Sequence, residues 1–223
     1  MKVIILFPKQ EFNQAQQRIL NQLGQVSYWH SRRELPVNQL IKLAAGAEVL
    51  AIDPDLFGGF EKARERVTKV AESLPGLKSL ALSTTSYGWI DLKYFRKRQI
   101  PVCNIPGYSR ESVAEHTLAL MLGLAKRIMV TDRKTQRGEY KLGMGFELKD
   151  KILGIIGWGN IGSRVAELAL GIGMKVIAFN RSFRKQPGVK MVSLKQLLQQ
   201  AHAISLHVID SEAGLNPPHW TVN

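Results

Sequence analysis

A glycine motif, G-x-G-x-x-G at residues 157–162, has the type and spacing of residues that could bind a phosphate group. A short apolar run at 152–156 precedes the motif, helical spacing follows over 161–170, and a second apolar run occupies 175–179. A glycine motif between a strand and a helix of one βαβ unit is typical of a dinucleotide-binding site. The alternative is a glycine-rich turn without a ligand.

Each residue of this motif has a separate expected task. Gly157 permits the tight turn, Gly159 leaves room for a pyrophosphate against the backbone, and Gly162 lets the helix pack closely on the strand. The N–H groups of Asn160 and Ile161 open the helix, where the helix dipole favours negative charge. We therefore expect these five residues to bind the cofactor pyrophosphate.

The end of the second strand of this unit predicts which dinucleotide is bound. An NAD site usually places Asp or Glu here to hold the ribose hydroxyls, whereas this sequence has Asn180, Arg181 and Ser182. Asn180 carries no charge that would repel a 2′-phosphate, Arg181 can form a charge-assisted pair with it, and Ser182 can donate a hydroxyl. The sequence therefore favours NADP(H), with NAD(H) and a merely solvated basic loop as the alternative.

Strands and helices alternate along the whole chain, which predicts an α/β fold with parallel sheets. Apolar runs that read as strands lie at 3–7, 26–29, 48–53, 78–82, 100–105, 152–156, 175–179, 189–192 and 203–208. In the strand order 3-2-1-4-5-6, the strand at 203–208 lies beside the motif strand. His207 and Val208 at its end are then expected to line the cofactor crevice, with simple packing as the alternative for His207.

A helix predicted at 112–128 is apolar nearly all round. Such a helix is buried either inside the protein or against a partner subunit. It is expected to end before a polar stretch at 131–141.

The net charge of +13 points to anionic partners, and most of it lies within residues 92–190. A nucleic-acid-binding protein is a weaker hypothesis, because basic residues interleaved with aromatic ones are confined to 93–98, which a solvated helix face explains. With only Cys103, disulfides and cysteine-rich metal clusters are excluded. The sequence shows neither a signal peptide nor a membrane span, so we expect a cytoplasmic protein.

Five segments together resemble the D-isomer-specific 2-hydroxyacid dehydrogenase family. They are residues 85–91, 100–102, 104–108, 113–117 and 154–162. The Asn-Arg-Ser end of the second strand is similar to NADPH-using glyoxylate and hydroxypyruvate reductases of that family, and phosphoglycerate dehydrogenases are also similar.

The resemblance implies a flavodoxin-like substrate domain, residues 1–98, and an incomplete Rossmann-like doubly wound domain that binds NAD(P), residues 99–223. It also implies a 2-keto or 2-hydroxy acid as substrate, with Thr85, Ser86 and Tyr87 offering backbone N–H groups to its carboxylate. Relatives of this family form homodimers around the cofactor domains, which would give the apolar helix at 112–128 a partner.

The family's reaction is hydride transfer between the nicotinamide and C2 of the acid, assisted by a His, a Glu and an Arg. None of these three residues can be placed here, because the sequence departs from the family pattern after residue 208. We therefore expect a C-terminally truncated oxidoreductase without an assigned catalytic residue. The alternative function is a non-catalytic dinucleotide-binding module.

Overall fold

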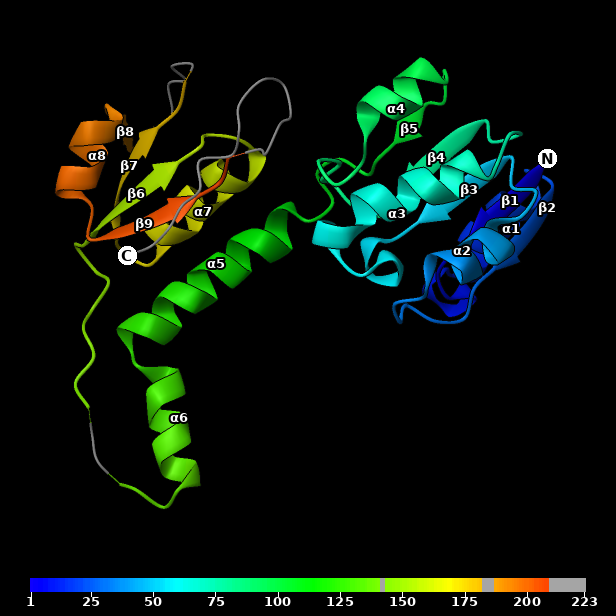
Figure 1. Cartoon of the computed structure of the whole chain (residues 1–223). Helices are drawn as coiled ribbons and strands as arrows, with labels where there is room; N and C mark the ends of the chain where they lie inside the picture. Colours follow the sequence, from blue (N-terminus) through cyan, green and yellow to red (C-terminus); the bar gives the residue numbers. More distant parts are fainter. Residues whose placement is uncertain (141–142, 182–186, 209–223) are drawn as a thin grey trace. The chain divides into compact units, whose positions relative to one another are not determined.

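The computed structural model of the chain describes residues 1–140, 143–181 and 187–208. It divides the chain into two compact units, residues 1–106 and 107–223 (Figure 1). Ser182, which is expected to contact a 2′-phosphate, lies outside the described residues. Within those residues, no helix combines the length and the apolar character needed to cross a membrane.

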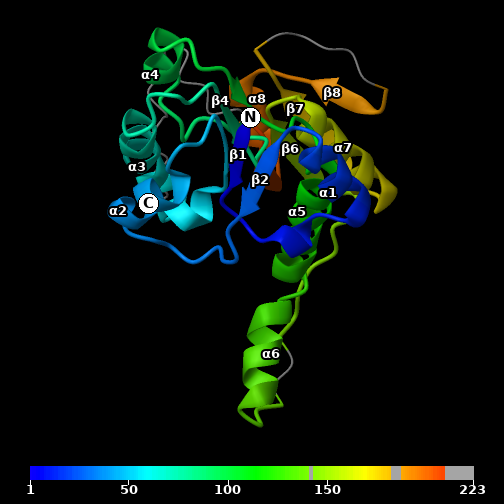
Figure 2. The same ribbon diagram turned by 90° about the vertical axis from the view of Figure 1, so that its right-hand side faces the viewer.

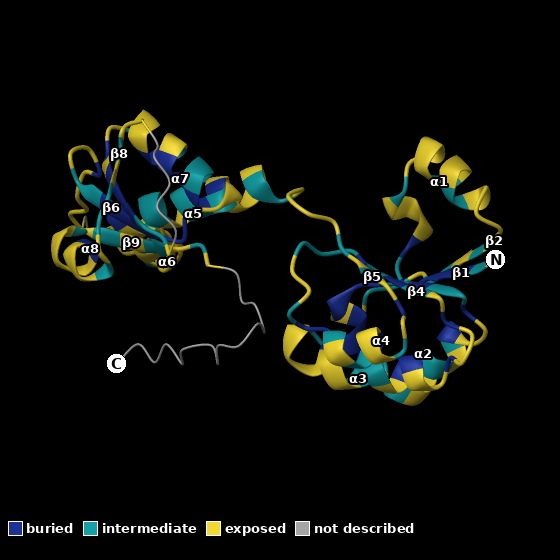
Figure 3. Ribbon diagram, turned by 90° about the horizontal axis from the view of Figure 1, so that it is seen from above, coloured by how far each residue is buried: buried dark blue, intermediate teal, exposed yellow. Residues whose placement is uncertain are grey.

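The first unit is a five-stranded parallel sheet with helices on both faces. Its strands are β1 (Lys2–Ile5), β2 (Gln25–Tyr28), β3 (Val49–Ile52), β4 (Ser79–Leu82) and β5 (Val102–Cys103). Its helices are α1 (Gln14–Asn21), α2 (Val37–Ala44), α3 (Phe60–Glu72) and α4 (Leu92–Lys97), and two 3-10 helices span Lys9–Glu11 and Pro54–Phe57. The spatial order β2-β1-β3-β4-β5 is the flavodoxin-like order that the family resemblance implies. Helix α1 covers one face of the sheet, and α2, α3 and α4 cover the other (Figure 3).

The core of the first unit follows from two periodicities in the sequence. Alternate residues of β4 are buried, as Leu80 and Leu82 show, because successive side chains of a strand point to opposite faces. Helix α3 buries Ala63, Val67 and Val70, whose spacing places them on one side of the helix. These residues belong to one hydrophobic cluster, which lies wholly within the first unit.

The first unit continues past Arg98, where the sequence analysis places the end of the substrate domain. Strand β5 pairs with β4 through the register Leu80 to Val102 and Ala81 to Cys103. The peptide that follows β5 stays attached to the same unit, because Ile105 N–H donates to the carbonyl of Thr84 at 3.1 Å. The compact units therefore meet between Pro106 and Gly107.

The second unit is a four-stranded parallel sheet with a helix layer on each face. Its strands are β6 (Ile152–Ile156), β7 (Lys175–Phe179), β8 (Val189–Met191) and β9 (Ala203–Leu206), in the order β8-β7-β6-β9. Its helices are α5 (Arg110–Ala125), α6 (Ile128–Gln136), α7 (Asn160–Gly171) and α8 (Leu194–Gln200). One core cluster joins α5 and α7 to one face of the sheet, and a smaller one packs α8 on the opposite face. The predicted order, with the fourth strand beside the first, is confirmed.

The apolar helix of the second unit differs from its prediction in two ways. It ends at Ala125, and a second helix, α6, occupies the stretch that was expected to be non-helical. The break lies at Arg127, whose φ of 57° is left-handed and interrupts the helical path. Leu120 and Leu124 on α5 are exposed, so this helix is only partly buried within its own unit. Helix α6 projects away from the sheet of that unit (Figures 1 and 2).

Candidate functional site

The glycine motif forms the turn between β6 and α7, at the carboxyl end of β6. Gly157 has a φ of 99°, which side-chain-bearing residues rarely adopt, and a Cβ there would lie 2.3 Å from the carbonyl oxygen of His207. A Cβ on Gly162 would lie 2.2 Å from the carbonyl oxygen of Gly157. These two glycines are therefore required for close packing of the turn.

Gly159 has a different environment, which bears directly on ligand binding. No atom would lie within 4 Å of a Cβ built on it, so the space beside its backbone is open. Gly159 is also the N-cap of α7 and supplies no side chain to cap that helix. The N–H groups of the first turn, including those of Asn160 and Ile161, remain available to an anion at the positive end of the helix dipole.

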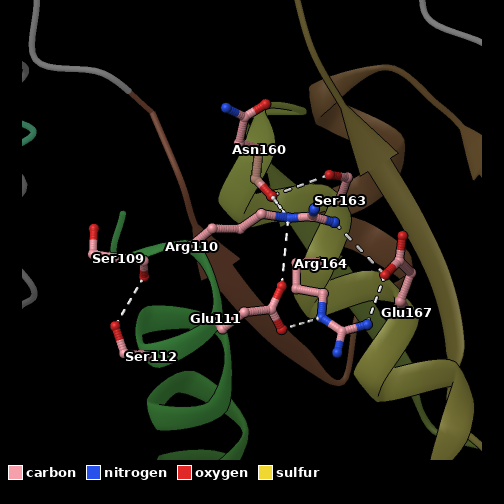
Figure 4. A network of polar contacts seen from close by, with 8 residues as sticks. All are labelled: Ser109, Arg110, Glu111, Ser112, Asn160, Ser163, Arg164 and Glu167. Carbon is pink, nitrogen blue, oxygen red and sulfur yellow. Dashed lines mark hydrogen bonds and ion pairs between the residues drawn. The ribbon is translucent and has the colours of Figure 1, made fainter. Parts of the chain in front are cut away.

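The start of α7 is tied to α5 by a network of charged side chains (Figure 4). Arg164 donates to Glu111 at 2.7 Å and to Glu167 at 2.8 Å. Arg110 Nε donates to the carbonyl of Asn160 at 3.2 Å. The residue that opens α7 is thus held from a neighbouring helix, so the N-terminal end of α7 is braced by side chains outside the glycine motif.

The polar residues that follow β7 lie at the same end of the sheet. Asn180 Oδ1 accepts a hydrogen bond from Trp158 N–H at 3.1 Å, so this amide braces the glycine turn. The sequence predicts for Asn180 only a role at the ribose. It does not reveal the contact with Trp158, because that contact depends on the distance between two turns in space. Arg181 is exposed.

His207 and Val208 follow β9 and lie beside the glycine turn. His207 N–H donates to the carbonyl of Ile156 at 2.7 Å, and the ring Nε2 lies 2.8 Å from Ser205 Oγ. Burial lowers the pKa of His207, so its ring is neutral at pH 7. Val208 is exposed. Since the glycine turn follows β6 and these residues follow the adjacent β9, they flank the switch point of the sheet.

The first unit holds the predicted carboxylate-binding residues in the loop that follows β4. Three consecutive carbonyl groups of this loop accept hydrogen bonds: Thr84 accepts from Ile105 N–H at 3.1 Å, Thr85 from Asn104 Nδ2 at 2.7 Å, and Ser86 from Trp89 Nε1 at 2.9 Å. In contrast, none of the backbone N–H groups from Thr84 to Trp89 donates to another described residue. The loop therefore presents donors without internal acceptors, which is the arrangement an anion requires.

A buried carboxylate anchors the start of this loop. Asp53, at the end of β3, accepts from Ser83 Oγ at 2.5 Å and from Asp55 N–H at 3.1 Å, and it pairs with Arg32 at 2.5 Å. Burial by itself raises the pKa of Asp53, but the hydrogen bonds from Ser83, Arg32 and Asp55 hold it below its ordinary value. Asp53 is thus ionised at neutral pH and holds Ser83 in place.

The chain is similar to known proteins in both sequence and structure. Residues 118–214 match the family model described as "D-isomer specific 2-hydroxyacid dehydrogenase, NAD binding domain". The chain is 35% identical over 150 residues to a glyoxylate reductase of Korarchaeum cryptofilum. The matched segment covers 63% of this chain and 45% of that protein. It is also 34% identical over 177 residues to a hydroxypyruvate reductase of Thermotoga maritima, and that matched segment covers 78% of this chain and 55% of that protein.

Two solved structures have a similar fold. D-lactate dehydrogenase from Aquifex aeolicus, complexed with NAD and lactic acid, superposes with a TM-score of 0.73 at 30% identity, covering 93% of this chain and 60% of that one. An acyclic imino acid reductase in complex with NADPH and D-Arg gives a TM-score of 0.76 at 26% identity, covering 95% of this chain and 66% of that one. The chain spans about half the length of the curated relatives it matches.

Proposed function

We propose that the chain is a member of the D-isomer-specific 2-hydroxyacid dehydrogenase family, whose NAD-binding-domain model matches residues 118–214, and that it serves an NAD(P)-dependent oxidoreductase that acts on a small 2-keto or 2-hydroxy acid. The observation that carries this proposal is the turn after β6, where open space at Gly159 adjoins an uncapped helix N-terminus. A pyrophosphate fits such a turn because it needs close backbone approach and N–H donors.

The second unit contributes the binding of the dinucleotide. Gly159, Asn160 and Ile161 contact the pyrophosphate through their backbone, while Gly157 and Gly162 keep the turn compact. Asn180 and Arg181 face the adenosine ribose, and His207 and Val208 line the crevice on the other side of the turn. The bound nicotinamide supplies or accepts the hydride, and this chain's residues hold and orient it.

The first unit contributes the binding of the acid. Thr85, Ser86 and Tyr87 donate backbone hydrogen bonds to its carboxylate, a role supported by the absence of other described acceptors for these N–H groups. Ser86 and Tyr87 are exposed and half-buried Thr85 adjoins them, so a small anion can reach the loop.

The test compares cofactor binding with turnover on the whole chain. Thermal shift with NADPH and with NADH measures binding, and NADPH oxidation with glyoxylate or hydroxypyruvate measures turnover. Turnover supports the oxidoreductase and shows that the chain supplies its own catalytic residues. Binding without turnover agrees with the expectation that no catalytic His, Glu or Arg can be placed in this sequence, and it also fits the alternative of a non-catalytic dinucleotide-binding module. A chain that neither NADPH nor NADH stabilises would contradict both functions.

We further propose that NADP(H) is preferred over NAD(H), because Arg181 can pair with a 2′-phosphate and no carboxylate stands at this turn. Replacing Arg181 with Asp should reverse the preference, since a carboxylate repels the 2′-phosphate and accepts hydrogen bonds from ribose hydroxyls. The ratio of the two dissociation constants, measured by titration, is the readout. An unchanged ratio in Arg181→Asp would show that Arg181 does not contact the phosphate.

We also propose that the chain forms a homodimer through the exposed apolar residues of α5 and α6. Leu120, Leu124, Ile128, Met129 and Val130 are exposed, and we refer to them together as the apolar face of α5 and α6. Large apolar side chains left exposed in this way favour contact with a partner surface.

A further inference from the structure

The orientation of the carboxylate loop depends on hydrogen bonds that its carbonyl groups accept. In a trans peptide the C=O and the following N–H point in opposite directions, and the described chain has no cis peptide. A donor that holds the carbonyl of one residue therefore also aims the N–H of the next residue away from that donor. This relation links each predicted carboxylate donor to a specific side chain or backbone group.

Three consecutive peptides of the loop are held in this way. Ile105 N–H holds the Thr84 carbonyl and so aims the Thr85 N–H. Asn104 Nδ2 holds the Thr85 carbonyl at 2.7 Å and so aims the Ser86 N–H. Trp89 Nε1 and Thr84 Oγ1 hold the Ser86 carbonyl at 2.9 and 2.7 Å and so aim the Tyr87 N–H.

Of these anchors, the amide of Asn104 can be changed with the least disturbance. Trp89 is 4% exposed and belongs to the core of the first unit, so replacing it would also alter packing. Asn104 is half-buried and follows β5, and its side chain crosses from that segment to the loop after β4. Thr85 Oγ1 makes a second bond between the same segments by donating to the Ile105 carbonyl at 3.0 Å.

We propose that Asn104 is a positioning residue, which holds the Thr85–Ser86 peptide so that the Ser86 N–H faces the carboxylate of a 2-keto acid. This inference rests on the proposed function for the identity of the anion. The hydrogen bond from the Asn104 amide to the Thr85 carbonyl, at 2.7 Å, joins two groups of the chain itself, so the orientation of the peptide does not depend on which anion is bound. Asn104 thereby acts through the loop and need not contact the acid.

The test replaces Asn104 with Leu and, separately, with Asp in the whole chain. Leu has a similar shape and no donor, and an ionised Asp has no donor but remains polar. The matched control is Ser79→Ala, which removes the 3.4 Å hydrogen bond from Ser79 to the Pro101 carbonyl, between the same two segments but away from the loop. The melting temperature and the helix content by circular dichroism report whether each variant is folded.

Two readouts by NMR separate this inference from the proposed function. In the ligand-free chain, we expect the order parameter of the Ser86 amide to fall in both Asn104 variants and to stay at its wild-type value in Ser79→Ala. Oxamate serves as a 2-keto acid analogue, and on its titration the wild-type amide resonances of Thr85 to Tyr87 should shift. The affinity of both Asn104 variants for oxamate should be about 10-fold weaker than that of the wild type, while Ser79→Ala should bind oxamate as the wild type does.

An unchanged Ser86 order parameter in Asn104→Leu and Asn104→Asp would overturn the positioning role, whatever the ligand does. A wild-type loop whose amides do not respond to oxamate would instead contradict the proposed acid-binding site, and the order parameters would still decide the role of Asn104. Weaker oxamate binding with an unchanged Ser86 order parameter would show that Asn104 contacts the ligand directly, which also overturns the positioning role.

Discussion

At the scale of single residues, the glycines of the turn after β6 separate folding from binding. Because no atom lies within 4 Å of a Cβ at Gly159, we expect Gly159→Ala to keep its melting temperature but to lose most of its affinity for NADPH. The same change at Gly157 brings a methyl group to 2.3 Å from a backbone oxygen at a left-handed φ, so Gly157→Ala should lower the melting temperature itself.

Thermal unfolding with and without NADPH measures both effects. Gly171→Ala is the control, since this glycine lies at the end of α7 with no atom within 4 Å of a built Cβ. Undiminished NADPH binding by Gly159→Ala would show that the pyrophosphate does not approach that backbone.

His207 makes the stability of the second unit depend on pH. Its pKa is lowered by burial, so the unfolded chain binds the proton more tightly than the folded chain does. The free energy of unfolding therefore carries no penalty from His207 above the unfolded pKa of about 6.5. It decreases as the pH falls below that value and through the lowered pKa of His207 in the folded chain. Between pH 7.5 and pH 5.5, we expect the melting temperature of His207→Gln to fall by less than the melting temperature of the wild type.

The comparison variant is His116→Gln, which removes an exposed histidine from α5 of the same unit. A pH dependence that is identical in wild type and His207→Gln would mean that the His207 ring does not titrate across this range.

At the scale of elements, the sequence predicted the alternation of strands and helices because period-two and period-3.6 patterns are local and strong. The order of the second sheet followed from the glycine motif and its βαβ unit, and the order of the first sheet was implied by the family resemblance. The sequence did not predict the helix break at Arg127, since left-handed backbone at a residue other than glycine leaves no compositional mark. Nor did it predict that Asn180 contacts Trp158 or that Asn104 contacts Thr85. Both are contacts between loops that follow different strands, and their distance is set by the folded sheet.

The apolar face of α5 and α6 gives a prediction at this same scale. Leu124 is 77% exposed, so a charge there leaves the folded subunit intact but removes apolar contact from a subunit interface. We expect Leu124→Glu to shift the chain from dimer to monomer in analytical ultracentrifugation, at an unchanged helix content by circular dichroism. The matched control is Leu198→Glu, on α8, where the leucine is 56% exposed outside this face. Sedimentation of Leu124→Glu as the wild-type species would exclude this face as the interface.

At the scale of the whole molecule, each unit has its own hydrophobic core, and each proposed ligand belongs to one unit. The core cluster of the first unit contains no residue beyond Ile100 among its buried members, and the clusters of the second unit begin at Ala114.

A ligand that binds only the folded form stabilises the cooperative unit that it contacts, by about 2.7 kcal/mol at 100 times its dissociation constant. NADPH should therefore slow amide hydrogen exchange in β6, β7 and α7, while β1, β3 and β4 exchange at the rates of the ligand-free chain. Equal protection of both sheets by NADPH would show that the two units unfold as one, and protection of the first sheet alone would contradict the assignment of the dinucleotide site to the turn after β6.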